Sequence, residues 1–221
     1  MLWKDSIRER VIKMAVWENL GHAMYEGVGE YGFPESRQVI DIPNIDEWIS
    51  FNFVKPRLRN KSKTGVHFYI TDQQFERVWN FPDRYGVALS EFGAVVGTDF
   101  SVYTDFPPAM AIYNTYRNRW LTRYWQDNGV YVIPNVRFGT KDTWNWCFDG
   151  LPQDSVVAIS NVGFMNKPEL RKLFMDGYNE MLTRLQPRKI IFYAKIVDDY
   201  KGPVQFVHFS MDKTIYKETE C

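Results

Sequence analysis

From Gly65 onward, the chain alternates between short apolar runs and stretches of helical periodicity. Helical spacing is found at 72–92, with a break near Pro82, and at 109–128, 140–148 and 167–186. The apolar runs between them predict strands near 66–70, 93–97, 130–135, 155–160 and 189–194, with a final strand at 204–209. Strands that are apolar throughout and alternate with helices are typical of a parallel sheet buried on both faces. We therefore expect an α/β fold with a mainly parallel sheet flanked by helices.

Two arrangements of this sheet are compatible with the pattern. Five or six strands are too few for a complete eight-stranded barrel, although the first 64 residues could add one or two more, including an apolar stretch at 48–54. The sheet is then a small or incomplete TIM-like barrel. An open doubly wound sheet fits the same order of elements, so the sequence leaves both alternatives open.

The N-terminal part differs in composition from the rest of the chain. Residues 1–20 have the spacing of an amphipathic helix, and residues 21–64 are irregular and rich in Gly, Pro and Asn. We expect 1–64 to be an extension that packs on the main domain, 65–221. Its last part, 55–65, carries five basic residues and is expected to be mobile and solvent-exposed. It is either a solvated linker or an arm that contacts phosphates.

Charge and composition narrow the class of protein. Lys+Arg and Asp+Glu balance at 27 each, which argues against a protein that coats nucleic acid nonspecifically but leaves room for a local basic patch. Many of the 8 Trp, 13 Tyr and 16 Phe residues must be core, and packing alone can explain them, although so many rings often leave some lining a groove. The two cysteines exclude a disulfide scaffold. There is no signal peptide and no apolar run of about 18 residues, so we expect a cytoplasmic protein without membrane contact.

Polar residues recur where the predicted strands end. Asp99 and Ser101 follow the strand at 93–97, Asn135 and Arg137 close the next one, and Asn161 follows 155–160. Because the carboxyl ends of parallel strands lie on one rim, these side chains should gather there. Helix capping and turn formation also explain Asn and Ser at such positions. Lys195, Asp198 and Asp199 follow the fifth strand in the same way.

The long helix at 109–128 holds a second polar group, which contains Asn114, Arg117, Asn118 and Arg119. Asn114 and Asn118 are one turn apart, with Arg117 on the same face. Asparagine is a poor helix former, so its presence in mid-helix indicates either a ligand or a buried polar network. The three His residues lack metal-ligand spacing, and only a pairing of His67 with Asp72 suggests a metal site. No residue pattern identifies a cofactor.

Several strings occur together in a familiar order. They are VWNFPDRYG (78–86), GTDFSVYTDFPPAMAIYNTYRNRWLTRYWQDNGVYVIPNVRFG (97–139), WCFDGLPQDSVVAISNVG (146–163) and LQPRKIIFYA (185–194). Over residues 65–210 the chain resembles the domain-of-unknown-function family 4417, small proteins of bacteria, phages and other mobile elements. The resemblance implies a phage or mobile-element setting, where small genes often serve DNA replication, DNA modification or host takeover. It points to the motif positions Asp99, Ser101, Asn114, Arg117, Asn118, Arg119, Asn135, Arg137 and Asp149.

These observations favour an enzyme-like or ligand-binding domain, although they leave open whether it is an enzyme. Asp99 is the expected general base or metal ligand, with Asn135 as its catalytic neighbour. Arg137 is expected to hold a phosphate in bidentate fashion, as part of a nucleotide or nucleic-acid substrate. The remaining residues expected to bind substrate are Asn114, Arg117, Asn118 and Asn161. The alternatives are a non-enzymatic interaction protein, such as a host-factor inhibitor, and a DNA-binding accessory factor that uses 55–65.

Overall fold

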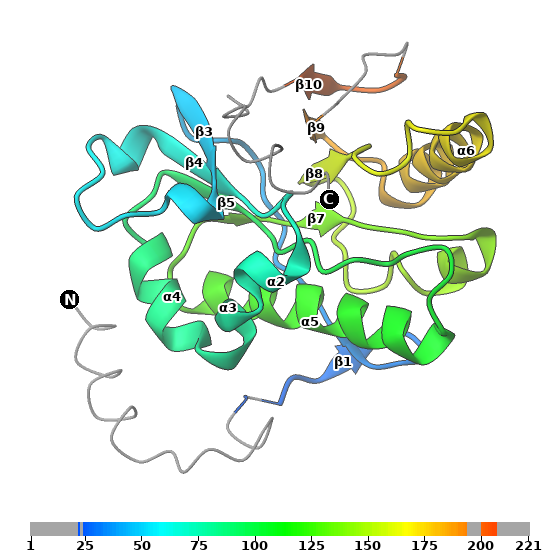
Figure 1. Ribbon diagram of the computed structural model, residues 1–221, viewed down its shortest axis with the longest axis horizontal. Helices are drawn as coiled ribbons and strands as arrows, with labels where there is room; N and C mark the ends of the chain where they lie inside the picture. Colours follow the sequence, from blue (N-terminus) through cyan, green and yellow to red (C-terminus); the bar gives the residue numbers. More distant parts are fainter. Residues whose placement is uncertain (1–21, 23, 194–199, 207–221) are drawn as a thin grey trace, which may run out of the picture.

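The computed structural model describes residues 22, 24–193 and 200–206, and a parallel sheet forms its centre (Figure 1). The strands are β3 (Glu47–Ser50), β4 (Thr64–His67), β5 (Ala94–Val96), β6 (Val132–Ile133), β7 (Asn135–Val136), β8 (Val156–Ser160), β9 (Lys189–Tyr193) and β10 (Val204–Phe206). All neighbouring strands in the orders β3-β4-β5-β6 and β7-β8-β9-β10 are parallel. The predicted α/β class with a mainly parallel sheet is therefore confirmed.

Pro134 joins the two halves of the sheet and divides a strand that the sequence predicts as one. The N–H of Gly97 donates to the carbonyl of Ile133 at 2.8 Å, and the N–H of Ala158 donates to the carbonyl of Pro134 at 2.9 Å. Proline has no N–H to donate to a ladder. The chain consequently pairs with β5 before the proline and with β8 after it.

Strand order decides between the two predicted arrangements. A doubly wound sheet reverses its order at a switch point, whereas the strands of a TIM barrel follow the chain. Here the order follows the chain from β3 to β10, and the described strands β3 and β10 are not paired with each other. The fold is therefore the incomplete, TIM-like barrel, which the described strands leave open between β3 and β10.

The inner face of the sheet packs on itself, which shows that the sheet curls. One buried cluster joins side chains of the first half to side chains of the second half, namely Trp48, Ala94, Val96 and Ile133 with Val156, Ala158, Ile191 and Tyr193. Val39, Ile42 and Ile45 of the segment before β3 also belong to or pack against this cluster, as do Tyr69 and Val162. The strand residues alternate with neighbours that point to the outer face, as the period of two requires.

Helices cover the outer face (Figure 1). Helices α2 (Asp72–Phe75), α3 (Arg77–Asn80), α4 (Pro82–Leu89) and α5 (Pro108–Asp127) share a buried cluster with β4, β5 and β6. Helix α6 (Pro168–Leu185) and the 3₁₀-helix η3 (Lys141–Asn145) share another with β7, β8 and β9. The predicted helical stretch 72–92 thus breaks into three short helices, the last of which begins at Pro82.

The described part of the N-terminal region contributes a hairpin and a strand. Strands β1 (Gly27–Val28) and β2 (Phe33–Pro34) pair antiparallel, and Phe33 is fully buried. The strand expected at 48–54 is shorter, because residues 51–53 form the 3₁₀-helix η1 (Phe51–Phe53). The helix predicted at 1–20 and the residues Lys195, Asp198 and Asp199 lie outside the described residues.

Most of the basic loop before β4 is exposed, as predicted, but Thr64 and Gly65 of the segment 55–65 are buried in β4. The mobility expected for this segment stays a prediction, and one of its lysines is paired with a residue outside it. Lys55, Arg57 and Arg59 are exposed. The short 3₁₀-helix η2 (Lys61–Lys63) follows them, and Nζ of Lys61 lies 2.5 Å from the carboxylate of Glu91. None of the helices in the described part of the chain is both long and apolar enough to cross a bilayer.

Candidate functional site

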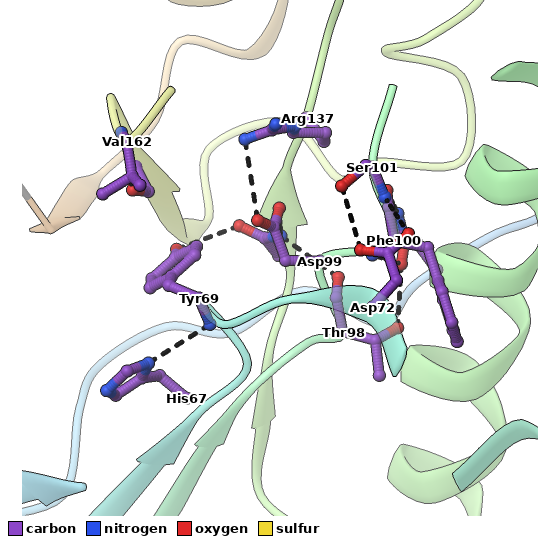
Figure 2. Close-up of polar contacts among 12 residues, drawn as sticks. His67, Tyr69, Asp72, Thr98, Asp99, Phe100, Ser101, Arg137 and Val162 are labelled. Carbon is purple, nitrogen blue, oxygen red and sulfur yellow. Dashed lines mark hydrogen bonds and ion pairs between the residues drawn. The ribbon is translucent and has the colours of Figure 1, made fainter. Parts of the chain in front are cut away.

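Asp99 lies at the carboxyl ends of β5 and β7, where it meets Asn135 and Arg137 (Figure 2). The amide nitrogen of Asn135 donates to Oδ1 of Asp99 at 2.8 Å, and Nη1 of Arg137 lies 3.6 Å from Oδ2. The Tyr69 hydroxyl donates to Oδ1 of Asn135 at 3.0 Å. The three residues predicted to share one rim of the sheet are therefore in contact, while their roles stay predictions.

The Arg137 side chain is only partly matched by the groups around it. Its distance from Asp99 is longer than a hydrogen bond, and its buried Nε has no hydrogen-bond partner among the described residues. The guanidinium lies 5.6 Å from the centre of the Phe164 ring, which provides a weak cation–π contact. About 10% of the side chain is exposed. Arg137 thus has an N–H donor without an acceptor among the described residues, in a site that is nearly closed to solvent.

The Asp99 carboxyl titrates near neutral pH. Burial raises the pKa of Asp99 to about 6, and the nearby Asp72 adds to the rise. Arg137 and the hydrogen bond from Asn135 act in the opposite direction. Desolvation outweighs the attraction of the guanidinium, so this carboxyl can take up and release a proton close to neutrality.

Side chains from two helices fix the segment that carries Asp99. Oδ1 of Asn118, on α5, accepts from the Thr98 hydroxyl and the Phe100 N–H at 2.9 Å, and its amide nitrogen donates to the Phe100 carbonyl at 3.0 Å. On the α2 side, Asp72 accepts from the N–H and hydroxyl of Ser101 at 3.0 and 2.9 Å (Figure 2). These bonds replace the sheet ladder, since β5 ends at Val96.

Three further polar residues of α5, Asn114, Arg117 and Arg119, contact the chain around the site and not Asp99 itself. Asn114 donates to the Ser101 carbonyl at 2.7 Å and accepts from Arg117 at 2.6 Å. Arg117 pairs with Glu76 at 2.6 Å and stacks 3.7 Å from the Phe100 ring. Arg119 is buried and donates to three backbone carbonyls, those of Asn135, Cys147 and Asp149. These residues hold the loops around the site in place.

Asn161 contacts Tyr200, in the segment before β10. It is fully buried at the end of β8, and its amide donates to the Tyr200 hydroxyl at 2.9 Å. The structure thus gathers Asp99, Asn135 and Arg137, surrounds them with the loop-holding residues of α5, and places Asn161 against Tyr200. The roles assigned to all seven residues remain proposals.

The sequence did not point to Tyr69 and Tyr193, which lie beside the site, nor to the packing of His67 against them. The Tyr69 and Tyr193 rings stack with their centres 5.3 Å apart, and the His67 ring lies 5.4 Å from Tyr193. Burial lowers the pKa of His67 to about 3, so it is neutral near pH 7, and its Nδ1 accepts from the N–H of Tyr69. His67 and Tyr69 alternate with apolar residues in the run 66–70, and this alternation is the sequence signal that could have revealed that both lie on one face.

The metal site considered for His67 and Asp72 has no support in the structure. Asp72 is engaged by Ser101, and His67 faces the tyrosines. Within the residues that the structure describes, no group of three or more His, Cys, Asp or Glu side chains is placed to hold a metal ion. A titrating carboxyl, a guanidinium, an amide and a tyrosine can together hold an anion and exchange a proton.

Comparison with known proteins places this site in a family. Residues 25–210 match the family described as Domain of unknown function (DUF4417). The chain belongs to this family. It is similar to the Gene 1 protein of Mycobacterium phage D29, with 36% identity over 179 residues, and to the Gene 1 protein of Mycobacterium phage L5, with 34% identity over 175 residues. Each match covers 78% of the chain, and they cover 64% and 75% of the two relatives.

The chain therefore spans slightly less than two thirds of the D29 protein. No solved structure matches it. The family membership confirms the resemblance drawn from the sequence, and both relatives are phage proteins. The DUF4417 description and the relatives' names specify no activity, so function has to be inferred from the site.

Proposed function

We propose that this DUF4417 protein is an enzyme that acts on a phosphate-bearing nucleotide or nucleic-acid substrate in DNA metabolism or modification, and that Asp99, Asn135 and Arg137 form its catalytic site. The observation that carries the proposal is the buried Nε of Arg137, which has no partner among the described residues. A buried donor without an acceptor costs free energy, and such a cost is often retained where a ligand supplies the acceptor.

Arg137 has the chemistry that a phosphate requires. Its planar guanidinium presents parallel N–H donors that match two phosphate oxygens, and lysine cannot reproduce that geometry. The 3.6 Å separation from Asp99 leaves the pair loose enough for a bound anion to compete with the carboxylate. The phosphate group of the substrate would then take the place of Asp99 as the partner of Arg137.

Asp99 has the chemistry of a general acid or base. Its pKa of about 6 lies close to the pH of most cells, which is where acid–base catalysis is efficient. Anion binding at Arg137 would weaken the attraction that holds the Asp99 pKa down. Asn135 would keep the carboxyl in position through its 2.8 Å hydrogen bond.

Calorimetric titration with a thymidine dinucleotide tests this site, because its phosphodiester does not titrate near neutral pH. Arg137→Lys should weaken binding by about tenfold or more, corresponding to about 1.4 kcal/mol. The matched control is Arg188→Lys, at an exposed arginine paired with Asp154, which should bind like the wild type. Titrations in buffers of different ionisation enthalpy should also show proton uptake near pH 6.5, and Asp99→Asn should abolish that uptake. Equal binding by the wild type and Arg137→Lys would contradict the proposal.

One observation favours the non-enzymatic alternative. Tyr103, Met110 and Tyr113 expose 52%, 48% and 42% of their surface in the loop before α5 and on its first turns. Exposed aromatic side chains are frequent anchors of protein–protein interfaces. If the protein does not bind the dinucleotide, and if Tyr103→Ser or Tyr113→Ser abolishes its binding to a partner protein, then it is an interaction protein.

A further inference from the structure

A second candidate surface lies on the first half of the sheet, between the end of β3 and helices α3 and α4. It is a groove of about 440 Å³ lined by η1, the following loop and these helices. Four of its lining residues are basic, namely Lys55, Lys61, Arg77 and Arg84. Glu91 is the single acidic residue among those that line it. It shares no residue with the group around Asp99.

The positive charge of the groove is largely uncompensated. Glu91 is already paired with Lys61 at 2.5 Å. In the described part of the chain, no carboxylate lies within ion-pair distance of Lys55, Arg77 or Arg84. Because the whole chain has a formal net charge of zero, this concentration of unpaired cations is a local feature.

Aromatic rings position the two arginines without neutralising them. The Arg77 guanidinium lies 4.9 Å from the centre of the Phe51 ring and 5.8 Å from that of Tyr85, and the Arg84 guanidinium lies 5.8 Å from the Tyr85 ring. Such contacts order an arginine while leaving its N–H donors available to an anion. Both arginines are exposed, and Tyr85 is half-buried.

The basic character continues beyond the groove into the adjoining loop. Arg57 and Arg59 are exposed there, and neither has a carboxylate partner among the described residues. Lys61 ties the loop to the groove, because its Nζ donates to the Pro56 carbonyl at 2.9 Å as well as pairing with Glu91. The cations therefore extend beyond the groove into the adjoining loop.

We propose that this groove and the adjoining loop bind the phosphodiester backbone of single-stranded nucleic acid. A concave, basic groove with an aromatic side chain matches the way in which proteins hold a single strand. A volume of about 440 Å³ suits a nucleotide unit, whereas a duplex is a wide rod that demands a protruding element or a broad surface. Five cations of the groove and loop have no carboxylate partner among the described residues, namely Lys55, Arg57, Arg59, Arg77 and Arg84, and this number favours a repeating anion over a mononucleotide.

Fluorescence anisotropy with a labelled oligothymidylate of about ten nucleotides tests the proposal. The affinity of the wild type should fall as the salt concentration rises between about 50 and 200 mM, and each lost phosphate contact should reduce the log–log slope by about 0.7. Arg77→Gln/Arg84→Gln should therefore flatten the slope by about 1.4 and weaken binding about tenfold or more at low salt. An oligouridylate of equal length forms the RNA arm and shows which sugar is preferred.

The matched control is Lys172→Gln/Arg188→Gln, which removes two exposed cations outside the groove. It should leave both affinity and slope unchanged, and a urea denaturation curve confirms that each variant is folded. Equal loss in both double variants would overturn the proposal, and so would equally tight binding of polyglutamate or of a duplex. The salt-dependence slope tests the groove, whereas the proton uptake that accompanies dinucleotide binding tests Asp99, so failure of the groove and failure of the Asp99 site are distinguishable.

Discussion

Asp99→Asn removes the titrating proton of the candidate site while keeping a side chain of nearly the same shape. The folded-state pKa of Asp99 is about 6, roughly two units above the usual 3.8, and each unit corresponds to about 1.36 kcal/mol. Because the folded state holds this proton more tightly than the unfolded chain, the stabilisation is complete below about pH 4 and is lost as the pH rises through about 6. Between these limits the wild type should lose about 3 kcal/mol of unfolding free energy relative to Asp99→Asn.

Urea denaturation of both proteins at a series of pH values between about 4 and 7 measures this difference. Other carboxyl groups are common to both proteins, so their effects cancel when the two free energies are subtracted. The missing partner of Arg137 shifts the variant by an amount that does not depend on pH, since the guanidinium stays charged. Asp105→Asn, at an exposed carboxyl in the loop before α5, is the control and should give a flat difference. A flat difference for Asp99→Asn as well would refute the assigned pKa and its cause.

Two further predictions concern the framework of the site. Arg119→Met should lower the unfolding free energy by about 3 kcal/mol or more, because three backbone carbonyls lose their buried donor; urea denaturation measures it, and a loss below about 1 kcal/mol would contradict it. Gly177→Ala should destabilise the protein by about 1–3 kcal/mol, although alanine favours helices, because the new Cβ would lie 2.4 Å from the Phe138 ring. Thermal denaturation against Asn179→Ala, on the exposed part of the same helix, tests this, and a rise in Tm would show that the ring moves aside.

The pattern of apolar and polar residues along the chain was sufficient to predict the main strands and helices and the α/β class. The long helix expected at 109–128 is found at Pro108–Asp127, and the helix expected at 167–186 is found at Pro168–Leu185. The choice between barrel and open sheet was beyond the sequence. Inward-facing Val156 and outward-facing Val157 are both apolar, so the pattern does not record which face curls inward. The break at Pro134 depends on pairing with two different strands, which is also a long-range property.

The site was predictable as a location more than as a set of contacts. Asp99, Asn135 and Arg137 were found because the carboxyl ends of neighbouring parallel strands share a rim. Asn114 and Asn118 in mid-helix indicate either a ligand or a buried polar network, and the structure shows both amides bonded to the backbone of the segment that carries Asp99. Their role in substrate binding stays a proposal. Tyr69 was missed because an aromatic residue in a buried strand is usually core, and only the tertiary structure shows its hydroxyl reaching Asn135.

Residues 98–101, which carry Asp99, are held by side chains of other elements and not by the hydrogen bonds of the sheet. The ladder of β5 ends before this segment, and Asp72, Asn114, Asn118 and Asn135 bond to its backbone groups. The side chains that hold the segment therefore lie outside it, mainly on helices α2 and α5, which precede and follow β5, with Asn135 on β7. Within this family, the geometry of this segment can consequently change through exchanges on α2 and α5 that leave every described strand, and even the segment itself, unchanged in sequence.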